Sequence, residues 1–367
     1  MPQPGNVICS ILPPHILRKL ADKPNLRDRI LHNIAVTERL RGIRQAFVMP
    51  ALAQQPGTKH RTIFDAQTGT TLPGTKVRDE GDAPSSDVAV NEAYDYSGDT
   101  YDFYQQVFNR NSVDDHGLTL KSTVHYDVGY DNAFWNGEQM IYGDGDGEYF
   151  QRFTICLDVI GHELTHGVTQ NEAQLTYQGQ PGALNESVSD VFGSLVKQWV
   201  NNQTADQADW LIGAGLFTNA VQGRALRSMA APGTAYDDPN IGKDPQPDNM
   251  ADYVNTDQDN GGVHINSGIP NRAFYLAATA IGGYAWQKAG LIWYRTLTGS
   301  LNPNADFQTM ANATTTVAGA IFGQDSNEQK AVRDAWTTVG VAPTASQIAA
   351  LTAPPKRPRT GRGKAAD

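Results

Sequence analysis

The most constraining feature of this chain is a pair of histidines four residues apart in the stretch VIGHELTHGVTQ, Val159 to Gln170. Four residues make about one turn of an α-helix, so His162 and His166 project from one face and can reach a single zinc ion. Glu163 points roughly 100° around the helix, toward a water molecule beside that metal. Taken alone, this short pattern does not distinguish a zinc site from a core or solvent-facing histidine pair.

A second motif, ALNESVSDVFG, supplies what such a metal site still lacks. A zinc ion that keeps an open position for water needs a third protein ligand, and Glu186 on a neighbouring antiparallel helix can provide it. Ligating histidines also need an acceptor for their other ring nitrogen, which Asp190 and Asn185 can provide. The two motifs together therefore favour a catalytic zinc site over a charged helix face.

A third cluster lies far downstream in the stretch DNGGVHINSGIPNRAF. Two glycines before His264 permit an unusual backbone path, and Asp259, five residues earlier, can orient the imidazole. Hydrolysis of an amide passes through an oxyanion, which preplaced hydrogen-bond donors stabilise. His264 and Tyr177 are the predicted donors.

Length and charge limit the domain count and the partners. A single core rarely grows past roughly 250 to 300 residues, so 367 residues predict two folded units with a cleft between them. The net charge is −10, but residues 1–49 carry +5 and residues 356–367 carry +4, which leaves −19 for the part between. An acidic body disfavours nucleic acid as the main partner and favours docking of its own basic N-terminal segment. We expect a monomer.

The N-terminus and the cysteines bear on the compartment. Residues 1–20 lack the basic and apolar regions of a secretory signal, and no apolar run anywhere is long enough to cross a membrane. The two cysteines, Cys9 and Cys156, lie in different segments and do not indicate a disulfide framework. Cys156 is interpreted as a buried free thiol, whereas the role of Cys9, including zinc ligation, stays open.

The pattern along the chain predicts an α+β fold. Apolar residues at helical spacing predict two short amphipathic helices between Ile16 and Phe47, after Pro13-Pro14. Strands around one helix near Val88 to Asn111 are expected up to Phe153, and helices dominate after residue 156. YGDGDGEYF, from Tyr142 to Phe150, is interpreted as a hairpin turn rather than a calcium loop. The expected parts are a propeptide (1–50), a β-rich domain (51–156), an α-helical domain (157–345) and a disordered basic tail (346–367).

The motifs HELTH, NESVSD, NAFWNG and NGGVHINSG resemble those of the thermolysin-like zinc endopeptidases, in the order and spacing of that family. The resemblance runs from about residue 60 to 342, and four separated motifs are highly specific. It implies a two-domain fold with the active-site cleft between a β-rich and an α-helical domain. It also implies one catalytic zinc ion (Zn2+), protein or peptide substrates, and an extracellular location, with a cytoplasmic one as the alternative because no signal peptide is recognised.

The resemblance also assigns residue roles. It implies that His162, His166 and Glu186 bind zinc and that Glu163 is the general base. Tyr177 and His264 would stabilise the oxyanion, Asp259 would orient His264, and Asp190 and Asn185 would support the zinc ligands. The remaining matches concern the substrate: Asn132, Ala133 and Arg227 would hold its backbone, and Phe150, Val159 and Leu226 would line the pocket for a large hydrophobic side chain after the cut bond.

The N-terminal stretch PPHILRKLA resembles the short propeptide of the protealysin-like branch of that family. This predicts a zymogen whose residues 1 to about 50 cover the cleft in cis until they are cut near Met49 to Gln54. The alternative is an ordinary helical extension.

One departure from the family concerns its paired calcium (Ca2+) site. Asp158 and Asp209 remain, but Lys197, Leu211 and Ala214 stand where carboxylates are expected. Two carboxylates are too few to form a double calcium cage. We therefore expect the Lys197 ammonium to replace the calcium ion beside Asp158.

Two other functions compete with an endopeptidase. A binding or inhibitor-like protein could keep the scaffold with its pro-segment permanently docked, but it would not need a base beside the metal. A zinc aminopeptidase would need a carboxylate site for the free amine of its substrate, and the sequence has no motif for one.

Overall fold

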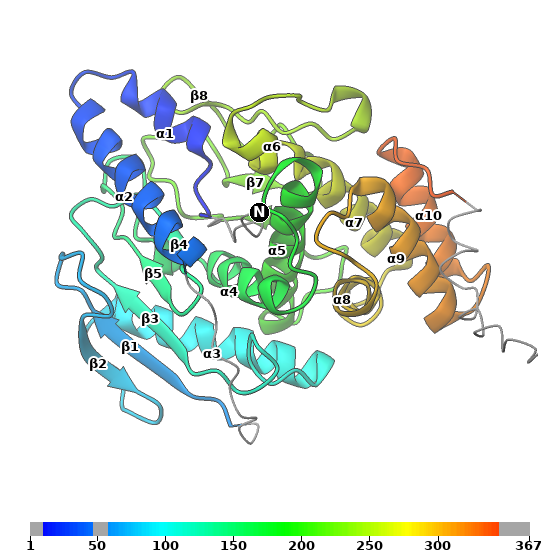
Figure 1. Cartoon of the computed structure of the whole chain (residues 1–367), viewed down its shortest axis with the longest axis horizontal. Helices are drawn as coiled ribbons and strands as arrows, with labels where there is room; N and C mark the ends of the chain where they lie inside the picture. Colours follow the sequence, from blue (N-terminus) through cyan, green and yellow to red (C-terminus); the bar gives the residue numbers. More distant parts are fainter. Residues whose placement is uncertain (1–9, 47–57, 345–367) are drawn as a thin grey trace, which may run out of the picture.

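The computed structural model describes residues 10–46 and 58–344 of the chain (Figure 1). Three predictions fall outside these residues: the role of Cys9, the cut region from Met49 to Gln54, and the basic tail. Within the described part, no helix is both long enough and apolar enough to span a bilayer.

The first half is built on a five-stranded mixed sheet in the order β2-β1-β3-β5-β4. The strands are β1 (Arg61–Asp65), β2 (Thr75–Asp79), β3 (Leu120–Val124), β4 (Ala133–Trp135) and β5 (Met140–Tyr142). β1, β3 and β5 run parallel, whereas β2 and β4 pair antiparallel with their neighbours. β4 is thus an edge strand among these five strands, and its outer side pairs with the N-terminal segment through the bridge between Ser10 and Phe134.

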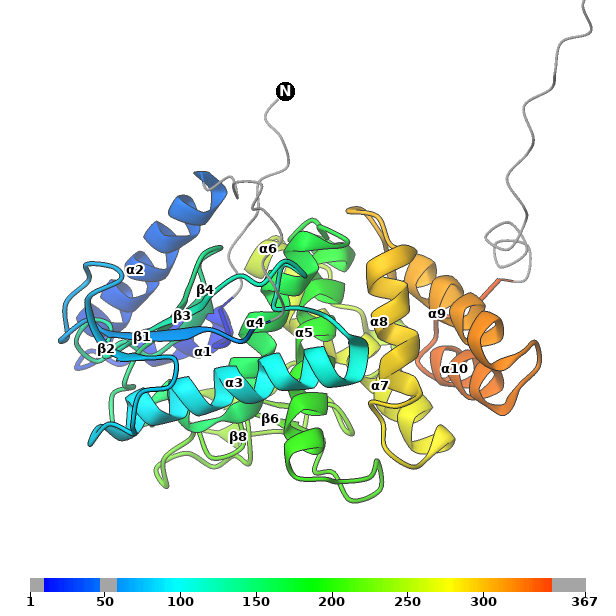
Figure 2. The ribbon, with the colours of Figure 1, turned by 90° about the horizontal axis from the view of Figure 1, so that it is seen from below.

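One long helix, α3 (Val88–Phe108), covers one face of this sheet, as predicted (Figure 2). It begins where the carboxylate of Asp87 accepts hydrogen bonds from the amides of Ala89 and Val90, which are donors without an intrahelical partner. It ends at Asn109, which adopts the left-handed conformation (φ 56°).

The predicted hairpin turn from Tyr142 to Phe150 is wrong. β5 already pairs with β3 on one side and β4 on the other, so no side remains for a returning strand. The segment forms a loop instead, in which Asp146 Oδ1 accepts hydrogen bonds from the amides of residues 148, 149 and 150 at 2.7–2.9 Å. Phe150 then forms an isolated bridge with Phe217.

The second half is mainly helical, as predicted. Its helices are α4 (Leu157–Asn171), α5 (Gly179–Val200), α6 (Asp259–Asn266), α7 (Gly268–Ile281), α8 (Ala289–Gly299), α9 (Phe307–Phe322) and α10 (Asn327–Thr338). The long connection from α5 to α6 carries two small strand pairs: β6 (Leu211–Ile212) with β7 (Arg227–Ser228), and β8 (Asp237–Asp238) with β9 (Gly242–Lys243). The 3-10 turns η1 (Phe153–Ile155) and η2 (Met250–Asp252) complete the set.

α4 and α5 approach closely because glycines meet between them. A Cβ on Gly193 would collide with the carbonyl oxygen of Asp158, and one on Gly161 would lie 3.1 Å from the Cα of Gly193. Glycine permits this backbone approach, which a side chain would prevent. The close contact brings the HELTH face of α4 against the NESVSD face of α5.

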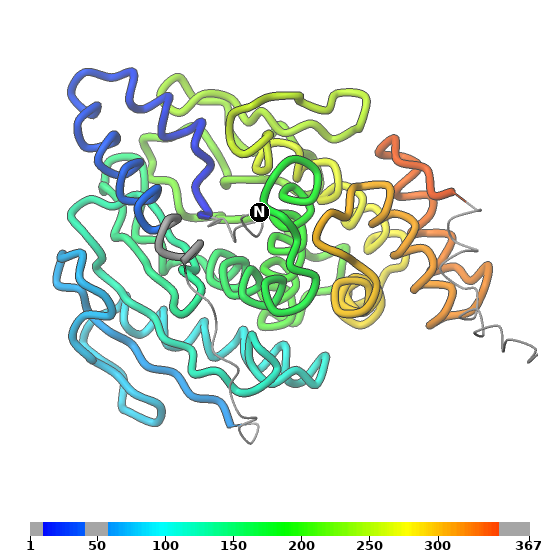
Figure 3. Tube along the Cα trace, viewed as in Figure 1, coloured from blue at the N-terminus to red at the C-terminus, as the bar shows by residue number. Residues whose placement is uncertain are grey.

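The N-terminal segment, residues 10–46, contains the two predicted helices, α1 (Pro14–Ala21) and α2 (Arg27–Ala46). α1 buries Ile16, Leu17 and Leu20. α2 is longer than predicted, and its Val36 and Leu40 belong to a small cluster with the aromatic side chains of the 126–134 region and Ile141. Figures 2 and 3 show the path: the segment starts deep in the molecule, continues as α1, and returns as α2 over the face of the sheet opposite α3.

Candidate active site

Three predicted metal ligands meet at the contact between α4 and α5. His162 Nε2 and His166 Nε2 lie 3.0 Å apart, and the Glu186 carboxylate lies 3.5 Å from the first and 3.6 Å from the second. All three side chains are buried, and their ligand atoms lie within 4.8 Å of one another. Glu186 Oε2 has no hydrogen-bond partner within the described part of the chain.

The outer nitrogens of both imidazoles are held by the partners that the sequence predicted. His162 Nδ1 donates to Asp190 at 2.7 Å, and His166 Nδ1 donates to Asn185 at 2.8 Å. These bonds leave both Nε2 lone pairs directed at each other and at a carboxylate. Such a set of two imidazoles and one carboxylate suits a zinc ion, because buried lone pairs and a buried charge need a cation between them.

Asp190 also binds the guanidinium of Arg227, with distances of 2.7 and 2.8 Å, and the amide of Asn271 at 2.9 Å. Burial raises the pKa of Asp190, but the charge of Arg227 and the hydrogen bond from His162 outweigh burial, and the pKa lies well below its usual value. Asp190 is therefore an ionised acceptor that fixes the ring of His162.

Glu163 is fully buried on α4, and its position is fixed from the sheet. The backbone amide of Trp135 on β4 donates to Glu163 Oε2 at 3.0 Å. The general base predicted from the sequence is therefore held by a strand of the first half, while its histidine neighbours come from the second half.

Tyr177, His264 and Asp259 also come together beside the metal ligands. Tyr177 Oη donates to Glu186 and lies 3.3 Å from His264 Nε2, and Asp259 accepts from His264 Nδ1 at 2.6 Å. Burial lowers the pKa of His264, but the carboxylates of Asp259 and Glu186 outweigh it, and the pKa is raised. The cluster depends on left-handed residues at the start of α6, namely Asp259, Asn260, Gly261 and Gly262, with φ between 50° and 82°.

The N-terminal segment enters this site and pairs with the edge of the sheet. Ser10 forms an antiparallel bridge with Phe134, and its carbonyl oxygen accepts from His264 Nε2 at 3.0 Å. Ile11 donates to the Ala133 carbonyl at 3.2 Å. A backbone strand is thus added to β4, with one carbonyl directed at His264, a predicted oxyanion donor.

The other predicted substrate contacts bind the same strand. Arg227 donates to the Ile11 carbonyl at 3.1 Å, and Asn132 Oδ1 accepts from the amide of Leu12 at 3.1 Å. Ile11 is fully buried in the same hydrophobic cluster as the three predicted pocket residues, Phe150, Val159 and Leu226.

Lys197 lies beside Asp158 and Asp209, as predicted from the missing calcium carboxylates. Its ammonium lies 2.8 Å from Asp158, 2.9 Å from Asp209 and 2.7 Å from the Leu211 carbonyl. Burial lowers the pKa of Lys197, but the two aspartates outweigh burial and raise it, so the ammonium stays charged. Ala214 contributes only its carbonyl oxygen, which accepts from the Cys156 thiol at 3.4 Å. Cys156 is a free, buried cysteine, as predicted.

Several residues of the site were not predicted from the sequence. Ser189 Oγ lies 2.9 Å from His166 Nδ1, and its spacing of four from Asn185 is a helical signal that would have identified it. Asn271 and Trp135 left no such signal, because one contacts Asp190 from a different helix and the other contributes only a backbone amide.

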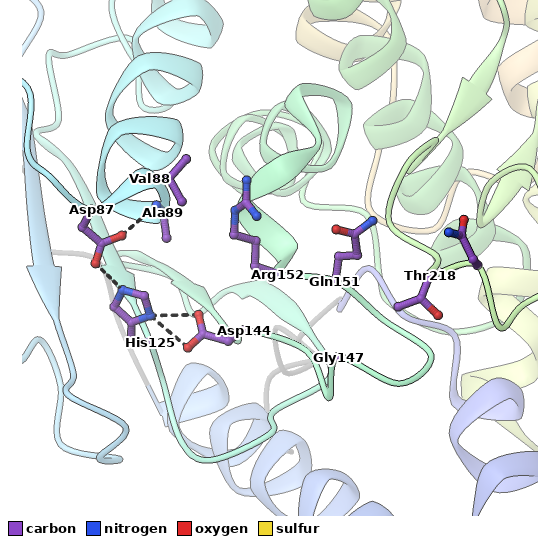
Figure 4. Close-up of a pocket in the computed structure, with 10 residues that line it drawn as sticks. Asp87, Val88, Ala89, His125, Asp144, Gly147, Gln151, Arg152 and Thr218 are labelled. Carbon is purple, nitrogen blue, oxygen red and sulfur yellow. Dashed lines mark hydrogen bonds and ion pairs between the residues drawn. The ribbon is translucent and has the colours of Figure 1, made fainter.

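A separate hollow of about 550 Å³ lies between the start of α3 and the loop after β5 (Figure 4). His125 lies at one end of it, with Nε2 2.7 Å from Asp87 and Nδ1 2.9 Å from both oxygens of Asp144. The hydrogen bond to Asp144 raises the pKa of His125 to about 9, with further help from Asp87 against the effect of burial. The imidazolium is therefore a structural cation that joins α3 to the β5 loop.

The chain is similar to known proteins along most of its length. Residues 47–170 match the thermolysin metallopeptidase catalytic domain, and residues 173–341 match the thermolysin metallopeptidase alpha-helical domain. An extracellular metalloprotease of Pectobacterium carotovorum subsp. carotovorum is 52% identical over 341 residues, covering 91% of this chain and 96% of that protein. A thermolysin of Alicyclobacillus acidocaldarius subsp. acidocaldarius is 42% identical over 299 residues, covering 78% of this chain and 52% of that protein.

A solved structure extends the likeness to the N-terminal segment. The precursor of protealysin, a metalloproteinase from Serratia proteamaculans, is 56% identical, with a TM-score of 0.83 and coverage of 91% of this chain and 100% of that one. With the matched domains, the paired histidines and Glu186, the chain belongs to the thermolysin family of metallopeptidases and resembles its protealysin-like members.

Proposed function

We propose that this metallopeptidase is a zinc-dependent endopeptidase made as a zymogen. The observation that carries the proposal is the buried set of His162, His166 and Glu186 with Glu163 held beside it by the Trp135 amide. A zinc ion bound by this set would supply Lewis acidity, activating water and polarising the substrate carbonyl.

The residues around the metal set divide the remaining chemistry. Glu163 takes a proton from water and later gives a proton to the leaving amine. Tyr177 and His264 donate hydrogen bonds to the oxyanion that develops on the substrate carbonyl, and Asp259 keeps the ring of His264 oriented toward it. Asp190 and Asn185 hold the two histidines in the tautomer that leaves Nε2 free for metal.

The substrate backbone would pair with β4 as the N-terminal segment does. Asn132, Ala133 and Arg227 bind its main chain after the cut bond, and a large hydrophobic side chain enters the pocket of Phe150, Val159 and Leu226. The burial of Ile11 beside the Arg227 contact supports this preference. Peptides with leucine, alanine and aspartate after the cut bond test it, and equal hydrolysis of all three would contradict it.

Glu163→Ala tests the endopeptidase itself. Loss of the general base lowers kcat/KM on a quenched peptide or casein by about 10²- to 10⁴-fold. Zinc content, measured by elemental analysis of both proteins, should stay stoichiometric. Equal hydrolysis by both forms would instead indicate a binding protein that keeps the scaffold.

In the zymogen, residues 1 to about 50 act as a propeptide in cis, because Ser10 and Ile11 take the place of a substrate at β4, His264 and Arg227. The remaining chain divides into the β-rich domain (51–156), the α-helical domain (157–345) and a basic tail (346–367). Incubation of the purified chain and sequencing of the new N-terminus should locate a cut near Met49 to Gln54. Full activity of the uncut chain would contradict the zymogen.

Compartment and calcium complete the proposal. Relatives named extracellular metalloproteases support secretion, which fractionation of cells and medium tests. The contacts of Lys197 support loss of the family's double calcium site. We further propose that the enzyme acts as a monomer on protein substrates.

A further inference from the structure

Two buried carboxylates of the first half are covered by α2. Arg29 Nη2 on α2 lies 2.6 Å from Asp146 Oδ2, and Asn33, one turn later, donates to Asp131 Oδ2 at 3.2 Å and to the Gly129 carbonyl at 3.1 Å. The side chain of Asp146 and the whole of Asp131 are fully buried. A guanidinium from the chain itself therefore already pairs with one of these two buried carboxylates.

The two carboxylates are not equally satisfied. One guanidinium faces two carboxylates, and Asp131 Oδ1 lacks a hydrogen bond of good geometry within the described residues. Burial and the negative charge of Asp146 raise the pKa of Asp131 to about 8, against the smaller effects of Arg29, the Asp146 amide and Asn33. Once α2 leaves, the carboxylates lose both Arg29 and Asn33 and become available to another cation.

The backbone pairing shows which part of a substrate would reach them. Ser10 lies opposite Phe134, the Ile11 amide donates to the Ala133 carbonyl, and the Leu12 amide donates to the Asn132 side chain. If the chain stays extended beyond the end of β4, its next residue lies opposite Asp131. Directly opposed residues of antiparallel strands lie about 4.5 to 5.5 Å apart at Cα. In the N-terminal segment this position is Pro13, where the chain turns into α1, so the cation is supplied by α2 instead.

We propose that Asp131 and Asp146 form a subsite that binds a basic side chain on the third residue after the cut bond of a peptide substrate. The proposal rests on the proposed endopeptidase function and names its substrate class. A peptide bound with its carbonyl at His264 and its hydrophobic side chain beside Arg227 extends toward Asp131. A lysine or arginine at the third position brings its charge to the two carboxylates that Arg29 and Asn33 have left.

Peptides that differ only at the third residue after the cut bond test the subsite in the zinc-loaded enzyme freed of its N-terminal segment. Arginine is compared with citrulline, which has nearly the same shape and no charge, and with glutamate. We expect kcat/KM for arginine to exceed that for citrulline by about tenfold at low salt and about twofold at 0.5 M NaCl, mainly through KM. Glutamate should be cut more slowly than citrulline. Equal rates for arginine and citrulline at low salt would overturn the subsite, whereas no cleavage of any peptide would overturn the endopeptidase function.

A variant identifies the carboxylate responsible. Asp131→Asn should reduce the arginine-to-citrulline ratio from about tenfold to about twofold. The matched control is Asp334→Asn on α10, which changes the net charge equally at a largely exposed position and should leave the ratio as in the wild type. An unchanged ratio in Asp131→Asn would refute the assignment. If that variant does not fold, the salt dependence of the wild-type ratio still decides the proposal.

Discussion

At the scale of single residues, buried carboxylates of the second half are held by cations that come from other elements. Asp190 on α5 is bound by Arg227 of β7, and Asp158 on α4 is bound by Lys197 of α5. An unpaired buried charge is strongly destabilising, so each cation is required by the carboxylate that it contacts. The sequence suggested the second pair only because a lysine stood among positions where carboxylates were expected.

Lys197→Met should destabilise the protein by about 3 to 5 kcal/mol, because Asp158, only 2% exposed, would remain buried without its cation. Urea unfolding measures this change, and Lys288→Met, at an exposed ion pair with Glu328, is the control, with an expected loss below about 1 kcal/mol. A calcium-selective chelator should leave the wild-type melting temperature unchanged. A sharp drop would show that calcium, rather than the ammonium, stabilises this region.

His125 predicts a pH dependence of stability. Its pKa in the folded protein is about 9, above the ordinary value of about 6.5 for an unfolded chain. Its ion pairs with Asp144 and Asp87 therefore stabilise the fold fully below about pH 6.5, and this stabilisation is lost as the pH rises through about 9.

Melting temperatures measured from pH 6 to 10 test this dependence. The wild type should lose more stability across that range than His125→Gln, in which no imidazolium can form. His60→Gln, at a half-exposed histidine beside Asp79, is the control and should follow the wild type. Parallel curves for the wild type and His125→Gln would contradict the role of the imidazolium.

At the scale of elements, the sequence predicted the helices better than the contacts between elements. Apolar spacing identified α3, the helices after residue 156 and the two N-terminal helices, because each buries one face. It failed at the Tyr142–Phe150 loop, where β5 is already paired on both sides, since strand neighbours are decided by the tertiary fold. The contact of α2 with Asp131 and Asp146 was not predicted either, because Arg29 and Asp146 lie more than a hundred residues apart in the sequence.

The docking of α2 should weaken as the pH rises. The pKa of Asp131 is raised to about 8 under α2, chiefly by burial and then by Asp146, so the carboxyl is buried mostly in its neutral form below that pH. An exposed aspartate has a pKa of about 3.9, so the penalty on docking grows from about pH 4 and levels off above about pH 8.

Amide hydrogen exchange in the uncut Glu163→Ala chain measures this weakening without self-cleavage. After correction for the intrinsic rate, the amides of residues 27–40 should lose protection between pH 6 and 9. Asp131→Asn in the same background cannot ionise and should lose less. The amides of α9 serve as an internal control within each sample. Equal loss in both chains would mean that Asp131 does not govern the docking of α2.

At the scale of the whole molecule, the N-terminal segment joins the two halves. It adds a strand to β4 through Ser10 and covers Asp146 through Arg29, both in the first half. In the second half, Lys23 donates to Asn240 at 2.5 Å and Arg18 donates to Gln258 at 2.8 Å. Figure 1 shows α1 beside the β8 and α6 region and α2 beside β4. The segment therefore restrains any motion of one half against the other.

Loss of the segment should lower the melting temperature of the remaining chain. The described part of the segment buries nine leucine, isoleucine and valine side chains, which include Ile11, Leu12 and Ile16, and their partners on both halves become exposed when it departs. We expect a drop of at least about 4 °C, since a ligand that binds only the folded state raises its stability.

The experiment uses the Glu163→Ala chain with a foreign protease site inserted between residues 47 and 57, so that cutting does not depend on its own activity. Melting is measured at a fixed scan rate on the uncut chain, on the cut chain, and on the cut chain after gel filtration under mild denaturant has removed the segment. Cutting alone should change little, because the contacts persist; removal should produce the drop. If the separated chain melts at the same temperature as the uncut chain, the two halves hold together without the segment. The only remaining effect of the segment would then be to occupy β4, His264 and Arg227.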